Sequence, residues 1–127
     1  MPIPYQIDHA RRLVIATPSG AFTEQDILAY QTEVWSRPEV AGYDEIVDMT
    51  NVTEMKIVAT EGVQMLAVLS ARMDTDEARS RFAIVAPTDH HFGVGRMYEA
   101  YRNTQPAGTK AVGVFRSREE ALRWLGK

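Results

Sequence analysis

The residues with the clearest chemical potential are Asp89, His90 and His91, which follow a run of apolar residues and precede a segment with helical periodicity. Imidazole and carboxylate groups are both suitable metal ligands, so this triplet raises the question of a metal site. Adjacent histidines point in different directions, however, and His9 is the only other histidine in the sequence. The triplet is therefore better explained as the start of a capped helix, and we predict no metal and no cofactor.

Two hydroxyl side chains, Thr60 and Ser117, stand at predicted helix starts. A hydroxyl nucleophile needs a neighbouring base, and neither residue has a recognisable base at a suitable spacing. Glu61 and Asp48 form too generic a carboxylate pair to be assigned acid/base catalysis. Arg96 lies one turn into a predicted helix, where it would either meet an anion or project into solvent, and we favour the solvated arginine. The sequence thus predicts a protein that is not an enzyme.

The composition excludes several other classes. The 127 residues are 45% hydrophobic and 24% charged, with a net charge of −3 and mixed signs along the chain, so nothing indicates nucleic-acid binding. Cysteine is absent, which excludes disulfides, thiolate metal sites and cysteine nucleophiles. The beginning of the chain does not resemble a signal sequence, and no apolar run is long enough to span a membrane. We expect a cytoplasmic protein without an integral membrane segment.

Strands are predicted where short segments are rich in apolar and β-branched residues. The first two predicted strands, Tyr5–Asp8 and Leu13–Thr17, are close enough in the sequence to form an antiparallel hairpin. A turn at Pro18-Ser19-Gly20 ends the second of them. The FAIVA run that starts at Phe82 is continuous enough to be buried on both faces. The predicted strands are Tyr5–Asp8, Leu13–Thr17, Glu45–Met49, Phe82–Ala86 and Ala111–Phe115.

Helices are predicted where apolar residues recur at helical spacing behind a capping residue. Thr23 with Asp26, and Ser117 with Glu120, have the spacing of capping boxes. Gly93 and Gly95 lower the stability of the predicted helix that contains them. Two glycines near a helix start indicate a close approach of the backbone to another group. The predicted helices are Thr23–Trp35, Thr60–Met73 with Thr60 as N-cap, His91–Asn103 and Ser117–Leu125.

The element order is therefore β-β-α-β-α-β-α-β-α. After the hairpin, strands alternate with helices, which predicts right-handed crossovers and parallel pairing. The expected architecture is a single α/β domain over residues 1–127, with a mixed, mostly parallel sheet of about five strands and four helices.

Three sequence segments resemble those of a known family: YDEIVDMTNV, RFAIVAPTDHHFGVGRMYEAYR and VFRSREEALRWL. Together with the element order and the length, they resemble the bacterial STAS/SEC14-type proteins of the SpoIIAA-like superfamily, named for the anti-sigma-factor antagonist. The similarity spans nearly the whole chain. The resemblance implies the fold and a regulatory or binding role.

One departure from that family concerns its phosphorylation motif. The antagonist has an aspartate-serine-serine-glycine motif at a helix start, and a partner kinase phosphorylates the second serine. The matching residues here look like Ala59-Thr60-Glu61-Gly62, which puts Glu61 at the modified position. A carboxylate carries a permanent charge that cannot be added or removed. We therefore predict that the chain is not switched by phosphorylation in the usual way.

Any functional surface is expected where the carboxyl ends of parallel strands meet helix N-termini. We predict that this surface is centred on Pro87–Arg96 and the facing Thr50–Gly62 loop. Its candidate binding residues are Thr50, Asn51, Thr60, Glu61, Thr88, Asp89, His90, His91 and Arg96.

Two functions remain open. The first is a non-catalytic regulatory or interaction module that binds a protein partner or a second copy of itself. The second is a carrier or enzyme that binds a small apolar or lipid-like ligand between its helices. A connected apolar cavity with few polar groups would favour the second function, and a solid core would favour the first.

Overall fold

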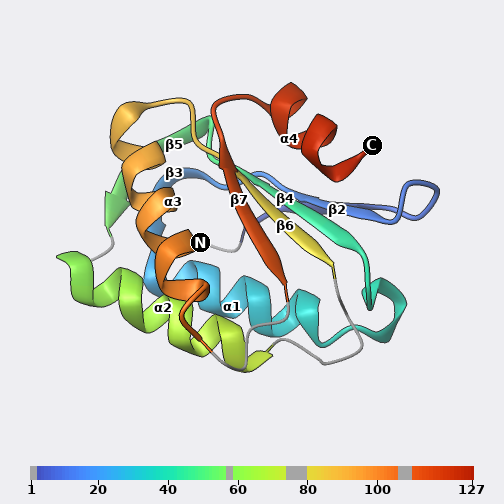
Figure 1. Ribbon diagram of the computed structural model, residues 1–127, viewed down its shortest axis with the longest axis horizontal. Coiled ribbons are helices and arrows are strands. Elements are labelled where there is room, and N and C mark those ends of the chain that lie inside the picture. Colours follow the sequence, from blue (N-terminus) through green and yellow to red (C-terminus); the bar gives the residue numbers. More distant parts are fainter. Residues whose placement is uncertain (1–2, 57–58, 74–79, 106–109) are drawn as a thin grey trace.

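The computed structural model describes residues 3–56, 59–73, 80–105 and 110–127, apart from the side chains of Ala59 and Thr60. Its main sheet has the strand order β1-β2-β4-β6-β7 (Figure 1). β1 and β2 pair antiparallel, and the other neighbours pair parallel, as the sequence predicts. These strands are β1 (Tyr5–Asp8), β2 (Leu13–Ala16), β4 (Asp44–Asp48), β6 (Arg81–Val85) and β7 (Ala111–Phe115).

A second, two-stranded parallel sheet corrects two sequence predictions. It pairs β3 (Ser19–Thr23) with β5 (Asn51–Lys56). The sequence predicts a turn at Pro18-Ser19-Gly20 and a loop at Thr50–Thr53, because glycine, serine, threonine and asparagine favour turns locally. Each segment instead finds its backbone hydrogen-bond partner in the other, about thirty residues away along the chain. Long-range pairing thus overrides the local turn signals.

Three helices cover one face of the main sheet and one covers the other (Figure 1). The predicted capping box of the first helix forms, because Thr23 accepts from the Asp26 backbone N–H and the Asp26 side chain accepts from that of Thr23. At the last helix only half of the predicted box is present: Ser117 accepts from the Glu120 backbone N–H, while the Glu120 carboxylate accepts from the Ser117 hydroxyl. Thr60 lies inside its helix, which begins one residue earlier, so the N-cap prediction there is wrong. The helices are α1 (Glu24–Trp35), α2 (Ala59–Met73), α3 (Asp89–Arg102) and α4 (Arg118–Leu125), with a short 3-10 helix η1 (Pro38–Val40) before β4.

Alternation along the strands divides the core into two layers. On β4, Val47 packs into the larger cluster beneath α1, α2 and α3. Its neighbour Ile46 points the other way, into a smaller cluster with Ala121 and Leu125 of α4. β6 lies between β4 and β7, so the FAIVA run is interior, as predicted.

Apolar periodicity predicts that α3 buries Val94, Met97, Tyr98 and Tyr101, and the structure confirms only Tyr98. The buried residues of α3 are His91, Gly95, Tyr98 and Arg102, whereas Val94, Met97 and Tyr101 are half-buried. Gly95 makes the predicted close approach, because a Cβ there would lie 3.0 Å from Val114 Cγ1 on β7. Gly93 is exposed with open space around it, so the close approach predicted for that glycine is wrong.

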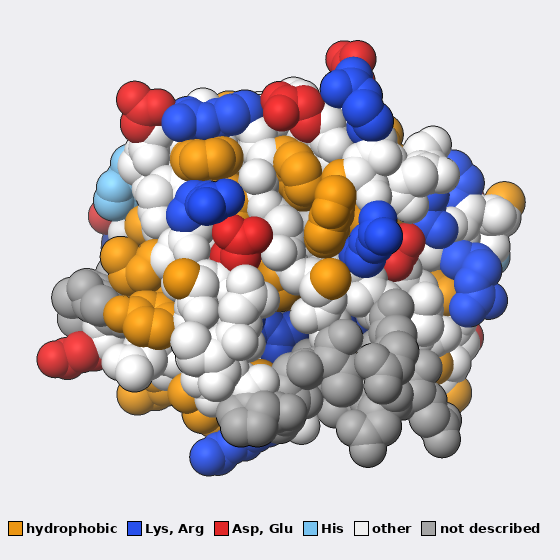
Figure 2. Space-filling model, viewed as in Figure 1, with side chains coloured by type: hydrophobic (Ala, Val, Ile, Leu, Met, Phe, Trp, Pro, Cys, Tyr) orange, Lys and Arg blue, Asp and Glu red, His pale blue; other side chains and the backbone are white. Residues whose placement is uncertain are grey.

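Acidic and basic side chains are interspersed on the face shown in Figure 2, with apolar groups scattered between them. None of the helices in the described part of the chain combines the length and the apolar content needed to cross a membrane. The sequence also predicts a charged helix end at Asp74–Ser80 and a turn at Thr104–Thr109, and residues 74–79 and 106–109 of these segments lie outside the described residues.

Candidate functional site

The carboxyl ends of β4, β6 and β7 meet at one edge of the sheet. Asp48, Val85 and Phe115 are in register across the three strands. The ladder continues one residue further, since the Met49 N–H donates to the Val85 carbonyl oxygen at 2.8 Å. Because the strand ends are aligned, the residues that follow them lie at the same edge (Figure 1).

Asp48 organises this edge. Its Oδ1 accepts hydrogen bonds from the Thr50 backbone N–H at 3.0 Å and from the Thr50 hydroxyl at 2.5 Å. Its Oδ2 lies 2.9 Å from Nη2 of Arg118, at the start of α4. Burial by itself would raise the pKa of Asp48, but the hydrogen bonds from Thr50 and Arg118 outweigh it and hold the pKa below its ordinary value.

Thr88, Asp89 and His90 stand beside this network at the start of α3. Thr88 is the N-cap and accepts from the His91 backbone N–H at 3.2 Å. Asp89 is exposed and lies 2.8 Å from Nη1 of Arg116, the residue that follows β7. His90 is also exposed. The structure thus brings Thr50, Thr88, Asp89 and His90 to one edge, where Arg116 and Arg118 join them.

His91 differs from the other predicted site residues because it is buried, with only 6% of its surface exposed. Burial, with a smaller contribution from neighbouring His90, lowers the pKa of His91. The lowered pKa favours the uncharged form of the ring. Within the described ranges there is no group of three or more histidine or acidic side chains that could hold a metal ion.

The remaining predicted residues lie apart from this edge or in other elements. Asn51 is the first residue of β5 rather than part of a loop. Thr60 and the exposed Glu61 stand at the start of α2, which Figure 1 shows at the far end of β5, away from the start of α3. Arg96 is exposed on α3 and lies 3.4 Å from Glu99, in accord with a surface arginine.

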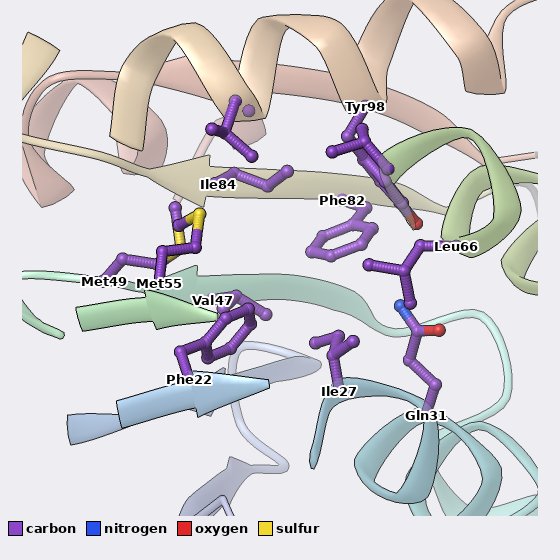
Figure 3. Close-up of a pocket in the computed structure, with 13 residues that line it drawn as sticks. Phe22, Ile27, Gln31, Val47, Met49, Met55, Leu66, Phe82, Ile84 and Tyr98 are labelled. Atoms are coloured by element: carbon purple, nitrogen blue, oxygen red, sulfur yellow. The ribbon is translucent and has the colours of Figure 1, made fainter. Parts of the chain in front are cut away.

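An apolar pocket lies between the helices and the sheet (Figure 3). It has a volume of about 50 Å³. Two of its lining residues are polar, Gln31 from α1 and Tyr98 from α3. The others are Phe22, Ile27, Val47, Met49, Met55, Val63, Leu66, Phe82, Ile84, Val94 and Gly95.

The strands and helices meet at this pocket for a simple reason. Val47 and Ile84 present their side chains to the helical face of the sheet, while Phe22 and Met55 come from the small β3–β5 sheet at its side (Figure 3). Four strands and three helices therefore contribute side chains to one space, and these side chains leave a small hollow between them. The lining has the apolar character that the second of the two open functions requires, and the volume suits only a very small ligand.

A second cavity of about 50 Å³ lies near Glu45, at the opposite end of β4. Glu45 is buried and accepts hydrogen bonds from the Tyr30 hydroxyl and from Trp35 Nε1, the latter at 2.9 Å. Burial raises the pKa of Glu45, although the positive charges of Lys110 and Arg102 oppose the increase. Lys110 Nζ also lies 4.7 Å from the centre of the Trp35 ring.

Sequence reasoning missed Gln31, Tyr30 and Glu45 as polar groups in the core. A signal was available for Gln31, because it lies one turn after Ile27 and three residues before Val34, on the apolar stripe of α1. A polar residue on such a stripe is either paired or exposed to a cavity. Glu45 gave a weaker signal, since a charged residue at a strand end is usually solvated.

Comparison with known proteins shows the fold. No family model and no curated protein matches the sequence. A solved structure of an uncharacterized protein from Shewanella loihica PV-4, of the DUF3478 family and with a SpoIIAA-like fold, is similar over 98% of this chain and 93% of its own. The TM-score is 0.60 and the sequence identity is 18%. This chain therefore has a SpoIIAA-like fold, as its sequence phrases and element order predict.

Proposed function

We propose that the protein is a non-catalytic regulatory module that acts by binding, and that it takes a small apolar ligand into the pocket beneath α1, α2 and α3. The observation that carries the proposal is the pocket itself, whose lining is apolar except for Gln31 and Tyr98. Ligand sites are typically apolar hollows with a few placed polar groups. A solid core would have favoured binding through the loops alone.

Within the described residues, the polar groups at the sheet edge already have structural roles. Ser117 caps α4 and Thr88 caps α3. Asp48 is engaged by Thr50 and Arg118. A nucleophile or general base needs a reactive group free to meet a substrate, and helix caps and ion pairs do not provide one. These roles support binding rather than catalysis.

Xenon titration followed by NMR tests the pocket whatever its natural ligand is, because xenon enters apolar cavities. We expect the methyl resonances of Val47, Leu66 and Ile84 to shift as xenon is added, and we expect the shifts to reach a plateau when the pocket is saturated. Val94→Phe should fill the pocket and abolish the shifts while the protein remains folded. Val68→Phe, on a half-buried position of α2 outside the pocket, is the matched control and should leave the shifts unchanged.

Native mass spectrometry of freshly purified protein complements this titration. We expect an additional mass that persists under gentle conditions, disappears on denaturation and is missing from Val94→Phe. If xenon produces no saturable shift in the wild-type protein and no mass is lost on denaturation, the pocket is not a binding site and the proposal fails.

A second candidate is a protein-interaction module that uses the carboxyl edge of the sheet. It is supported by the exposure of Thr50, Asp89 and His90 at one edge, beside the Arg116 and Arg118 ion pairs. The test is the double variant Asp89→Ala/His90→Ala in a pull-down of partners or a measurement of self-association, because both side chains are exposed at this edge. Binding should weaken while Tm stays almost unchanged. Binding that survives this change but is lost on altering exposed positions of α1 or α4 would place the partner elsewhere.

A further inference from the structure

α2 differs from the other helices in the side chains that it exposes. No other large apolar side chain of the described residues is as exposed as Met65 of α2, at 58%. Val68 and Leu69, about one turn further along α2, are half-buried. The exposed positions of α1, α3 and α4 carry charged, polar or small side chains instead. One exposed apolar residue is common on protein surfaces, so its neighbours decide what it indicates.

Met65 belongs to a row of side chains along the outer side of α2, which we call the outer stripe. The outer stripe consists of Glu61, Met65, Val68 and Arg72. Their spacings of four, three and four residues place them within about 60° of one another around the helix axis. The opposite side of α2 packs against α1 and α3, and its buried residues include Val63, Leu66, Ala67 and Ser70. The outer stripe therefore faces away from the rest of the protein, and Figure 1 shows α2 at the lower margin of the molecule.

The two ends of the outer stripe carry opposite charges. Glu61 lies in the first turn of α2 and Arg72 in the last, and both side chains are exposed. Neither forms an ion pair within the described part of the chain, so both charges are available to another molecule. Between them, the outer stripe is apolar.

The order of these residues makes the outer stripe complementary to itself. Glu61 and Arg72 are equally far from the middle of the helix, between Leu66 and Ala67, and so are Met65 and Val68. A two-fold axis through this point would place α2 of a second copy antiparallel to the first. Met65 then faces Val68 of the second copy, and Glu61 faces Arg72 of the second copy. Apolar side chains meet at the centre and opposite charges meet at both ends.

We propose that the outer stripe of α2 is the contact surface of a homodimer in which the two copies of α2 pack antiparallel. Met65 and Val68 of both copies form the apolar centre, and two ion pairs between Glu61 and Arg72 flank it. The charge pattern favours a second copy as the partner, because an acid at one end and a base at the other match the same surface turned by the two-fold axis. The dimer is independent of the ligand pocket, which α2 lines with Val63 and Leu66 from its opposite side.

The size of the contact sets the expected affinity. One pair of helices forms a small interface, and small interfaces are typical of weak, reversible complexes. We therefore expect a concentration-dependent equilibrium between monomer and dimer with a Kd in the micromolar range or weaker.

Sedimentation equilibrium of the wild-type protein at several concentrations measures this Kd. Met65→Lys should weaken the dimer at least about tenfold, because each copy then brings an unpaired charge to the apolar centre. Glu119→Lys is the control, since the Glu119 side chain is 84% exposed on α4, which covers the other face of the sheet. The control should dimerise as the wild type does, and circular dichroism shows whether each variant is folded.

A charge exchange tests the antiparallel arrangement itself. Glu61→Arg places two bases on each outer stripe, and Arg72→Glu places two acids there. Each variant alone should dimerise at least about tenfold more weakly than the wild type, because like charges meet at both ends. An equimolar mixture of the two variants should form a heterodimer at least about tenfold more stable than either homodimer, and added salt should reduce this preference.

Three results would overturn the inference. The first is a wild-type protein that stays monomeric up to about 1 mM. The second is a dimer that Met65→Lys leaves intact, and the loss of that dimer in Asp89→Ala/His90→Ala would place self-association at the sheet edge. The third is a mixture of the charge variants that associates no better than each variant alone. A failed xenon titration leaves the dimer unaffected, so the two proposals fail separately.

Discussion

Ser70 and Gln31 join α2 to α1 through a buried hydrogen bond of 2.7 Å, and both residues are completely enclosed. The bond fixes the side chain of Gln31, which lines the apolar pocket, so it links the packing of two helices to the geometry of the candidate site. A side-chain hydrogen bond in such surroundings is costly to break on one side only.

We expect Ser70→Ala to lower the free energy of unfolding by about 1–3 kcal/mol, because Gln31 Oε1 would be left buried without its donor. The double variant Gln31→Leu/Ser70→Ala should be more stable than Ser70→Ala alone, since no unpaired group remains. Urea denaturation of wild type, both single variants and the double variant measures the coupling. Strictly additive effects would show that the two side chains do not interact.

The two glycines of α3 form a matched pair for a second prediction. Gly93→Ala should raise the free energy of unfolding by up to about 1 kcal/mol, because alanine favours helix and the site has open space. Gly95→Ala should be less stable than Gly93→Ala by about 1–3 kcal/mol, because its Cβ would lie 3.0 Å from Val114 Cγ1. Thermal denaturation of the two variants side by side checks the order, and equal stabilisation by both would contradict the close packing of α3 on β7.

Asp48 provides a prediction for acidic pH. Its pKa is below the ordinary value of 3.8 in the folded state, so the folded protein binds its proton less readily than the unfolded chain. Its contribution to stability is therefore complete above about pH 4–5 and is lost as the pH falls through the lowered pKa. We expect Asp48→Asn to lower the free energy of unfolding by about 1–2 kcal/mol at pH 7, and this difference should shrink below pH 3.8.

Denaturant titrations of wild type and Asp48→Asn between about pH 2.5 and 7 test this dependence. Arg118→Gln is the control, and it should cost less than about 1 kcal/mol, because a half-exposed arginine contributes little through its ion pair. A constant difference between Asp48→Asn and wild type over the whole range would show that Asp48 does not titrate abnormally.

The pKa of Glu45 is shifted in the opposite direction from that of Asp48, so stability should depend on pH in the opposite way. Burial raises its pKa above the ordinary value of 4.5, so the folded protein holds the proton more firmly than the unfolded chain. Its ionisation then lowers stability as the pH rises from about 4.5 through the raised pKa.

Glutamine in place of Glu45 would keep an acceptor for Tyr30 and Trp35 without the charge. We expect Glu45→Gln to gain stability relative to wild type as the pH increases through this window, as urea denaturation at about pH 4.5, 6 and 7.5 would show. A relative stability that falls over that range would mean that the carboxylate is stabilised as an anion.

The predicted surface can be assembled from the sequence only in part. Thr50, Thr88, Asp89 and His90 follow strands that their apolar runs identify, so parallel pairing brings them to one edge. The sequence assigns Asn51 and Glu61 to the same region because the β5 strand looks like a turn. Arg116 and Arg118 belong to the same edge, but nothing in the order of residues indicates that the turn after β7 would pair with Asp48 and Asp89.

Local patterns in the sequence are enough to specify the main strands, the capping of α1 and α4 and the SpoIIAA-like order of elements, because these depend on periodicity and on side chains that bond to nearby backbone. The pairing of β3 with β5, the burial of His91, Gly95 and Arg102 on one side of α3, and the meeting of Gln31 and Tyr98 at one pocket emerge only in the folded molecule. These features depend on contacts between residues far apart in the chain. Their physical cause is the space left between packed elements, which no local pattern of residue types specifies.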